Sequence, residues 1–146
     1  MIPDINNFTW QSLHEYIERI ISSTQNALQA FNKDARAHRL ATSTGLEHQL
    51  DFLQWCLSLV NEMQHREDMQ VICPIMSVGT IRLRCRHAQY SASDFAWIVP
   101  IANNRYSLKR INSSEPEVEW YFEGDTNQVI EKVEKLVKEI CSQEKH

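Results

Sequence analysis

Three arginines at alternate positions form the most distinctive chemical pattern in this chain, in the run Ile81-Arg82-Leu83-Arg84-Cys85-Arg86-His87. Side chains along a β-strand point to opposite faces in turn, so Arg82, Arg84 and Arg86 would share one face while the apolar residues between them face a core. Neighbours on one face lie about 6.5–7 Å apart. A row of cations at this spacing could hold a polyanion, or it could pair with acidic residues on a neighbouring strand.

Acidic residues in a suitable pattern occur near the end of the chain, where Glu119, Tyr121 and Glu123 alternate in a second strand-like segment. Opposite charges across a sheet contribute about 0.2–1 kcal/mol per pair, so we expect these glutamates to form ion pairs with Arg82, Arg84 and Arg86. A second interpretation is an acidic protein partner. A third is nucleic acid, bound with the help of Lys109 and Arg110, although the net charge of −4 disfavours general nucleic-acid affinity.

Motifs for catalysis, metals and cofactors are missing from the sequence. The glycines Gly45, Gly79 and Gly124 cannot build a phosphate-binding GxGxxG or GxxxxGK[ST] loop. There is no GxSxG, HExxH or CxxC motif. Cys85 and His87 share a strand face, but a structural zinc site needs four ligands at recognisable spacing. We therefore predict no catalytic residue, no metal ligand and no cofactor, while an enzyme site assembled from distant residues remains an alternative.

Two stretches in the first half carry apolar residues at heptad spacing, which is typical of packed helices. The first begins after Asn6 and Asn7, with Ser12 and Glu15 as a second capping signature. Its apolar residues are Trp10, Leu13, Ile17, Ile20, Thr24, Ala27 and Phe31. The second opens with the capping box Thr44-Gly45-Leu46-Glu47 and carries Leu46, Leu50, Leu53, Leu57, Val60 and Met63. We predict an antiparallel helical hairpin.

The second helix has apolar residues beyond this seam, namely Phe52, Trp55 and Leu59. We interpret them as extra helical surface through which the chain forms a homodimer. Trp55 is in addition a candidate anchor for a partner, because tryptophan is enriched at binding hot spots. The alternative for Trp55 is burial under the sheet or the neighbouring helix.

Beyond residue 70 the apolar period changes from 3.5 to two, which predicts strands. The apolar segment 71–76 is interrupted by Pro74 and suits a strand start, an edge or a bulge. Four strands are expected over 80–87, 95–101, 105–111 and 118–123. Asn103 and Asn104 suit a tight turn, and pairing Ala102 with Arg105 would place Trp97 opposite Arg110. The last helix begins at Asp125 or Thr126 and has the apolar face Val129, Val133, Leu136, Val137 and Ile140.

Together these patterns predict one α+β domain over residues 1–146: a helical part at about 7–67, then a four-stranded, mainly antiparallel sheet and a C-terminal amphipathic helix at about 71–143. We find no signal peptide and no apolar stretch long enough for a membrane span, which predicts a cytoplasmic protein. The function we expect is a non-catalytic protein-interaction module of the inhibitor, neutralising or adaptor type. The alternatives are a nucleic-acid-binding regulator and an enzyme with an unrecognised site.

Overall fold

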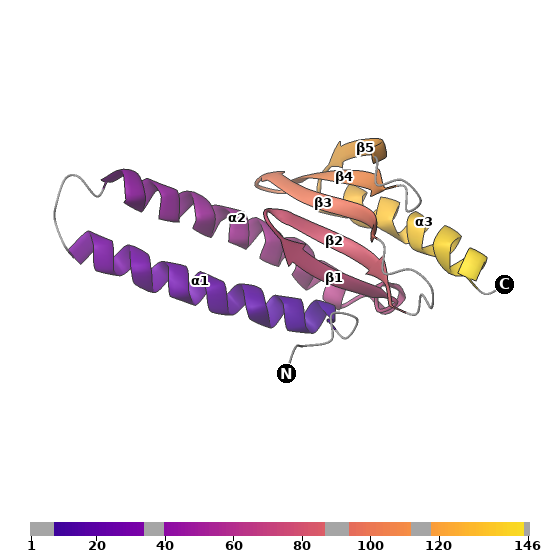
Figure 1. The fold of residues 1–146 in the computed structure, drawn as a ribbon, viewed down its shortest axis with the longest axis horizontal. Helices are drawn as coiled ribbons and strands as arrows, with labels where there is room; N and C mark the ends of the chain where they lie inside the picture. The colour runs from indigo at the N-terminus through magenta and orange to yellow at the C-terminus, as the bar shows by residue number, and fades with distance from the viewer. Residues whose placement is uncertain (1–7, 34–39, 87–93, 112–117, 145–146) are drawn as a thin grey trace.

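The computed structural model describes residues 8–33, 40–86, 94–111 and 118–144 and confirms the α+β class (Figure 1). The helices α1 (Trp10–Lys33) and α2 (Leu40–Gln64) are followed by a short 3-10 helix, η3 (Glu67–Met69). The strands are β1 (Ile72–Ser77), β2 (Thr80–Cys85), β3 (Asp94–Ala102), β4 (Arg105–Ile111) and β5 (Val118–Gly124), and helix α3 (Thr126–Glu144) ends the fold.

The sheet has five antiparallel strands in the order β1-β2-β3-β4-β5, so the prediction of four strands was wrong by one. The extra strand is β1, which contains Pro74. The Arg86 N–H donates to the Val71 carbonyl at 2.8 Å, and bonded pairs alternate along an antiparallel ladder. By that alternation Pro74 lies where the main chain faces away from β2, so its missing N–H costs the ladder nothing.

Both capping boxes predicted for the hairpin were misplaced. Helix α1 is capped by Thr9, whose Oγ1 accepts a hydrogen bond from the Ser12 N–H at 3.0 Å, while Ser12 Oγ accepts one from the Thr9 N–H at 2.8 Å. Ser12 is therefore the partner of the cap, and Asn6 and Asn7 lie outside the described residues. Helix α2 already begins at Leu40, upstream of Thr44, because no helix breaker precedes the predicted box.

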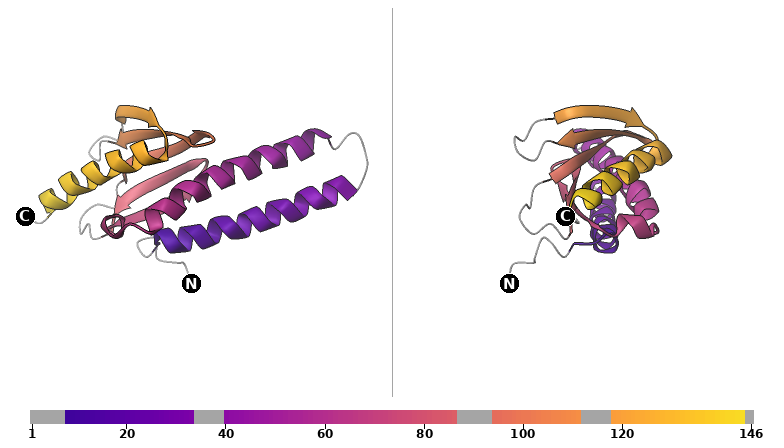
Figure 2. Two further views of the ribbon diagram at one scale, coloured as in Figure 1. Left: turned by 180° about the vertical axis from the view of Figure 1, so that it is seen from behind. Right: turned by 90° about the vertical axis from the view of Figure 1, so that its right-hand side faces the viewer.

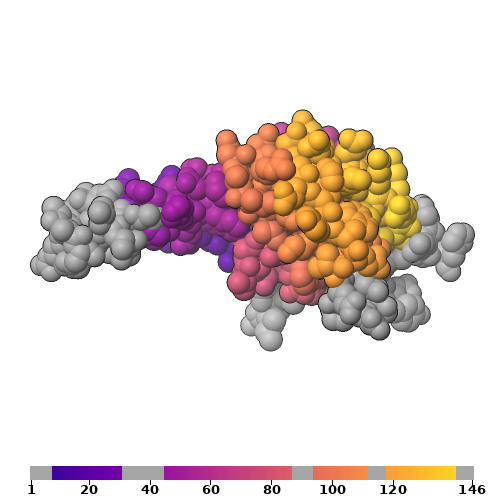
Figure 3. All heavy atoms as spheres, turned by 90° about the horizontal axis from the view of Figure 1, so that it is seen from above, coloured from indigo at the N-terminus to yellow at the C-terminus, as the bar shows by residue number. Residues whose placement is uncertain are grey.

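All three helices lie on one face of the sheet, and the core fills the space between (Figures 1 and 2). Leu13, Ile17 and Leu53 are buried as expected, whereas Ile20, Leu50 and Leu57 are only partly buried. Figure 3 shows that the hairpin extends well beyond the sheet. The buried side of the sheet is formed by Ile81, Leu83, Ala96, Ile98 and Leu108, and α3 contributes Val129, Ile130 and Val133.

Helix α2 packs against both α1 and the sheet, which accounts for its wide apolar arc. Leu59, from which we expected self-association, is fully buried within the monomer, and Phe52 packs against the core. The buried Tyr106 hydroxyl donates to the Trp55 carbonyl at 2.8 Å and ties this helix to β4. These residues therefore no longer argue for a dimer through α2.

The β3–β4 hairpin shows how one bulge changes which side chains meet. Ala102 pairs with Arg105 as predicted, but the register shifts between Pro100 and Ala102. Trp97 is consequently opposite Lys109 rather than Arg110. Because paired residues share a face, Lys109 and Trp97 lie side by side on the same surface.

Of the two predicted caps, Asp125 and Thr126, the C-terminal helix uses Asp125, whose Oδ1 accepts a hydrogen bond from the Gln128 N–H at 2.9 Å. The Gln128 Oε1 accepts one in return from the Asp125 N–H at 2.9 Å. Asn104, from the β3–β4 turn, accepts hydrogen bonds from the N–H and the hydroxyl of Thr126 at 3.1 and 2.7 Å. This turn thus fixes the start of α3 against the sheet.

Candidate binding surface on the open face of the sheet

The sheet face opposite the helices carries an ordered row of side chains. Successive strand pairings join five residues directly across the sheet, namely Ile75, Arg82, Trp97, Lys109 and Tyr121. None of the described helices covers this face (Figure 2). Adjacent members of such a row have Cα atoms about 4.5–5.5 Å apart, so cationic and aromatic residues alternate at neighbouring positions. We call this set the cross-strand row.

A charged cluster adjoins the row at Asp94. One carboxylate oxygen accepts hydrogen bonds from Arg82 Nε at 2.5 Å and from Trp97 Nε1 at 2.6 Å. The other accepts one from Arg84 Nε at 2.6 Å. Asp94 is only 7% exposed, so its negative charge needs a partner. The two guanidinium groups compensate that charge, and the carboxylate in turn holds both of them in place. Arg82, Arg84, Asp94 and Trp97 form what we call the Asp94 cluster.

A bulge puts Asp94 on this face. The β2–β3 register shifts between Leu83 and Arg84, so that Arg84 lies opposite Asp94. Without the shift, Arg84 would lie opposite Phe95, which is buried in the core instead. Burial by itself would raise the pKa of Asp94, but the hydrogen bonds from Arg82, Arg84 and Trp97 outweigh it and hold the pKa below its usual value. Asp94 is therefore a permanent anion near neutral pH.

The arginines thus have a different partner from the one we predicted. Glu119 and Glu123 lie on β5, which is not adjacent to β2. Glu123 lies 3.5 Å from Arg105 and Glu119 lies 4.0 Å from Arg110. The signal for Asp94 was present in the sequence as an acidic residue directly before the predicted strand 95–101, which a hairpin would bring beside 80–87. We overlooked it because it stands outside the alternating pattern.

The remaining predicted site residues are spread over the molecule. Arg86 donates to the main-chain carbonyls of Gln70, Phe8 and Ile72 at 3.1, 2.6 and 2.9 Å, so it anchors the start of α1 and β1. Its part in ligand binding stays a prediction. His87, the second ligand of the zinc alternative, lies outside the described residues.

Of the other three candidates, only Lys109 joins the cross-strand row. Arg110 follows Lys109 in β4 and so faces the other side, where its Nη1 donates to the Phe95 carbonyl at 2.8 Å. Trp55 is half-buried on α2, away from the open face of the sheet. The structure therefore brings together Arg82, Arg84 and Lys109 and separates Arg110 and Trp55 from them.

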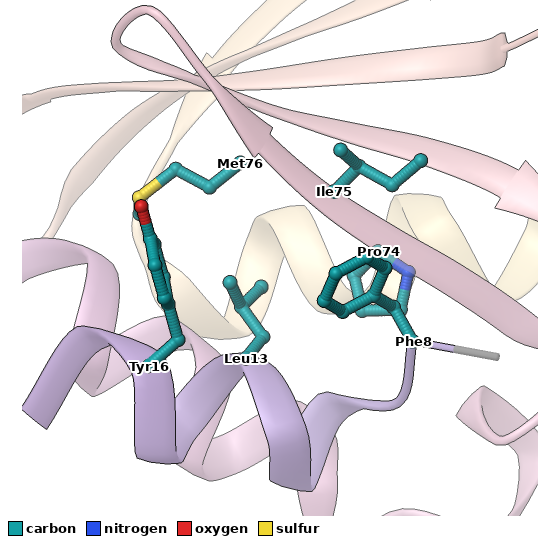
Figure 4. A pocket seen from close by; sticks show the side chains of 6 residues that line it. All are labelled: Phe8, Leu13, Tyr16, Pro74, Ile75 and Met76. Carbon is teal, nitrogen blue, oxygen red and sulfur yellow. The ribbon is translucent and has the colours of Figure 1, made fainter. Parts of the chain in front are cut away.

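A small apolar pocket lies between α1 and β1, next to the end of the row. Its lining residues are Phe8, Leu13, Tyr16, Pro74, Ile75 and Met76 (Figure 4). Its volume of about 200 Å³ is below the usual 300–1,000 Å³ of sites for drug-sized ligands. Space of this size fits a single apolar side chain.

The titratable groups with shifted pKa values are not poised for proton transfer or nucleophilic attack. Burial raises the pKa of the Cys56 thiol to about 12, and burial likewise raises the pKa of Tyr106. A buried neutral thiol is a poor nucleophile. Within the described ranges, no three His, Cys, Asp or Glu side chains come together as metal ligands. Nor does any described helix have the length and apolar character to cross a membrane.

Comparison with protein-family models, curated proteins and solved structures found no match. The functional interpretation therefore depends on the open face itself.

Proposed function

We propose that this chain is a non-catalytic protein-interaction module that binds an acidic segment of a partner protein on the open face of its sheet. The observation that carries the proposal is the Asp94 cluster, in which one buried carboxylate holds two arginines and a tryptophan on a face without helices. Arginine and tryptophan are the residue types most enriched at binding hot spots.

The cluster supports carboxylate binding in particular. Arg82 and Arg84 use Nε to bind Asp94, and their Nη atoms have no hydrogen-bond partner among the described residues. Paired Nη atoms match the two oxygens of a carboxylate. Because Asp94 already restrains both side chains, a ligand would lose little of its binding energy to ordering them.

The cross-strand row adds apolar contact area to this charged centre. Trp97 is half-buried between Arg82 and Lys109, and Tyr121 is 68% exposed at the end of the row. A partner segment with carboxylates flanking apolar side chains would match this alternation. As part of the same proposal, we place this interaction module in the cytoplasm, as expected from the sequence.

A second candidate is single-stranded nucleic acid, favoured by the alternation of cations and aromatic rings in the row. The charge balance favours the first candidate. Asp94 neutralises half of the charge of its two arginines, and Glu123 lies two residues from Tyr121 on the same face of β5.

The test is affinity capture from the cells that make the protein, comparing the wild type with Lys109→Glu. Lys109 makes no ion pair within the described part of the chain, so reversing its charge leaves the Asp94 cluster intact. The control is Arg19→Glu, an equal charge change on the exposed surface of α1. We expect an acidic protein to be captured by the wild type and the control and lost with Lys109→Glu.

Two results would contradict the proposal. Capture that nuclease treatment abolishes would favour the nucleic-acid candidate. Capture that is equally strong with Lys109→Glu, or absent with the wild type, would show that the open face is not the binding surface.

A further inference from the structure

The edge strand β5 carries an unusual concentration of exposed apolar side chains. Val118 is 47% exposed, Trp120 38% and Tyr121 68%. Elsewhere in the described chain, large exposed apolar residues stand singly, as Ile101 does at the end of β3. No described strand or helix lies beyond this edge (Figures 1 and 2). Contiguous exposed apolar surface of this kind marks a contact site.

The main chain of β5 is also directed outward at this edge. Bonded and non-bonded pairs alternate along antiparallel strands, and the Arg86–Val71 bond sets the alternation. Along the cross-strand row, Arg82 then bonds to Ile75 and Trp97 bonds to Lys109. Tyr121, at the end of the row, therefore points its N–H and C=O away from β4, as does Glu123, whereas Glu119 lies in the bulge where the β4–β5 register shifts. This strand can accept a further strand.

The opposite edge of the sheet is closed to such pairing. Pro74 of β1 has no N–H to offer, and the Ile72 carbonyl accepts a hydrogen bond from Arg86 Nη2 at 2.9 Å. Phe8 and α1 lie against the same strand (Figure 4). Head-to-tail addition of β5 to β1 of another copy is thereby blocked, and so is an open filament. Two copies can therefore pair edge to edge in only one way, β5 against β5, which gives a closed dimer.

One register of that arrangement matches side chains well. Centred on Trp120, an antiparallel pair places Trp120 opposite Trp120 of the second copy, Val118 opposite Phe122 and Glu119 opposite Tyr121. Centring on Tyr121 instead would oppose Glu119 with Glu123, a repulsive pair. We propose that β5 is the self-association surface of this chain, and that two copies pair antiparallel about Trp120 to form one continuous sheet.

This dimer would join the two open faces into a single surface with two Asp94 clusters. A partner with two acidic segments would then gain from simultaneous engagement. The dimer does not depend on the binding function proposed above, because β5 pairing uses the main chain and the Val118 and Trp120 side chains rather than the arginines.

The test is sedimentation equilibrium of the full chain across the micromolar range. We expect the wild type to show twice the 17.1 kDa monomer mass. Val118→Lys should weaken the dimer at least about tenfold, the effect of about 1.4 kcal/mol. Ile101→Lys is the matched control, because Ile101 is 46% exposed against 47% for Val118, and it should leave the dimer unchanged. Circular dichroism verifies that each variant is folded.

A second variant reports the register independently. Trp120 would form a non-bonded pair with its copy, at a Cα separation of about 4.5 Å, which a disulfide can span. Trp120→Cys should therefore give a covalent dimer on oxidation, whereas Ile101→Cys and the wild type should not. A monomeric wild type overturns the proposal and leaves the edge for a foreign strand or for solvent. Equal weakening by Val118→Lys and Ile101→Lys, or no specific cross-link at Trp120→Cys, overturns it as well.

Discussion

Replacing Asp94 with Asn removes the charge at the centre of the Asp94 cluster while keeping the shape of the side chain. The amide retains one acceptor oxygen, but its NH₂ group would face an N–H donor from an arginine or from Trp97. The variant therefore loses charge assistance at all three hydrogen bonds and opposes donor to donor at one or more of them.

The magnitude follows from the exposure of the partners. Hydrogen bonds to a charged group contribute about 1.5–3 kcal/mol each, and breaking a buried ion pair costs about 3–5 kcal/mol. The Arg84 side chain is 17% exposed, but that of Arg82 is 34% exposed and recovers much of its hydration. We therefore expect Asp94→Asn to lower the free energy of unfolding by about 3 kcal/mol, at the lower end of the range for a buried pair.

Urea unfolding at neutral and acid pH, followed by tryptophan fluorescence, measures this loss and its electrostatic origin. The pKa of Asp94 in the folded chain lies below its ordinary value of 3.8. The carboxylate therefore stabilises the fold fully above that ordinary value, and this contribution is lost as the pH falls through the folded-state pKa. The difference between wild type and variant should shrink over the same pH interval.

The control is Glu123→Gln, which removes an exposed pair 3.5 Å from Arg105 and should cost less than about 1 kcal/mol. A loss below about 0.5 kcal/mol for Asp94→Asn at neutral pH, a change typical of neutral surface substitutions, would contradict a stabilising role for the Asp94 charge. A loss of the same size in acid as at neutral pH would contradict it as well.

Four further substitutions should change stability, each measurable by urea unfolding. Val78 has φ of 42° at the tip of the β1–β2 hairpin and is 99% exposed, so Val78→Asn should raise stability by about 1 kcal/mol by removing left-handed strain; unchanged stability would contradict this. Leu53 is 4% exposed, and Leu53→Ala should cost about 2–5 kcal/mol; a loss below about 0.5 kcal/mol would place it outside the core. A Cβ at Gly124 would meet Gln128 Oε1 at 2.7 Å, whereas one at Gly45 would meet nothing within 4 Å. Gly124→Ala should therefore destabilise, and Gly45→Ala, inside α2, should stabilise by about 0.5–1 kcal/mol; the opposite order would be inconsistent with both environments.

The sequence by itself determined the type and order of the elements except β1, which it did not assign as a strand. Heptad spacing in the first half and alternation in the second reflect which side chains of a single helix or strand are buried. They therefore predict the type of element without knowledge of the elements packed against it. For the same reason Leu13, Ile17 and Leu53 could be assigned to the core, and the cap of α3 could be narrowed to Asp125 or Thr126. The start of α2 was misjudged because a capping box resembles a helix start even when the helix continues upstream.

The tertiary structure alone decided which charges and surfaces meet. Arg82 and Arg84 could be paired on paper with Glu119 and Glu123, but the meander places β3 rather than β5 beside β2. Two bulges then set the site, one bringing Asp94 opposite Arg84 and the other bringing Lys109 opposite Trp97. Strand order and register depend on contacts between residues distant in sequence, and a one-residue shift moves a side chain to the opposite face. Local sequence patterns do not predict such a register shift. The set of residues on the open face could therefore be determined only from the tertiary structure.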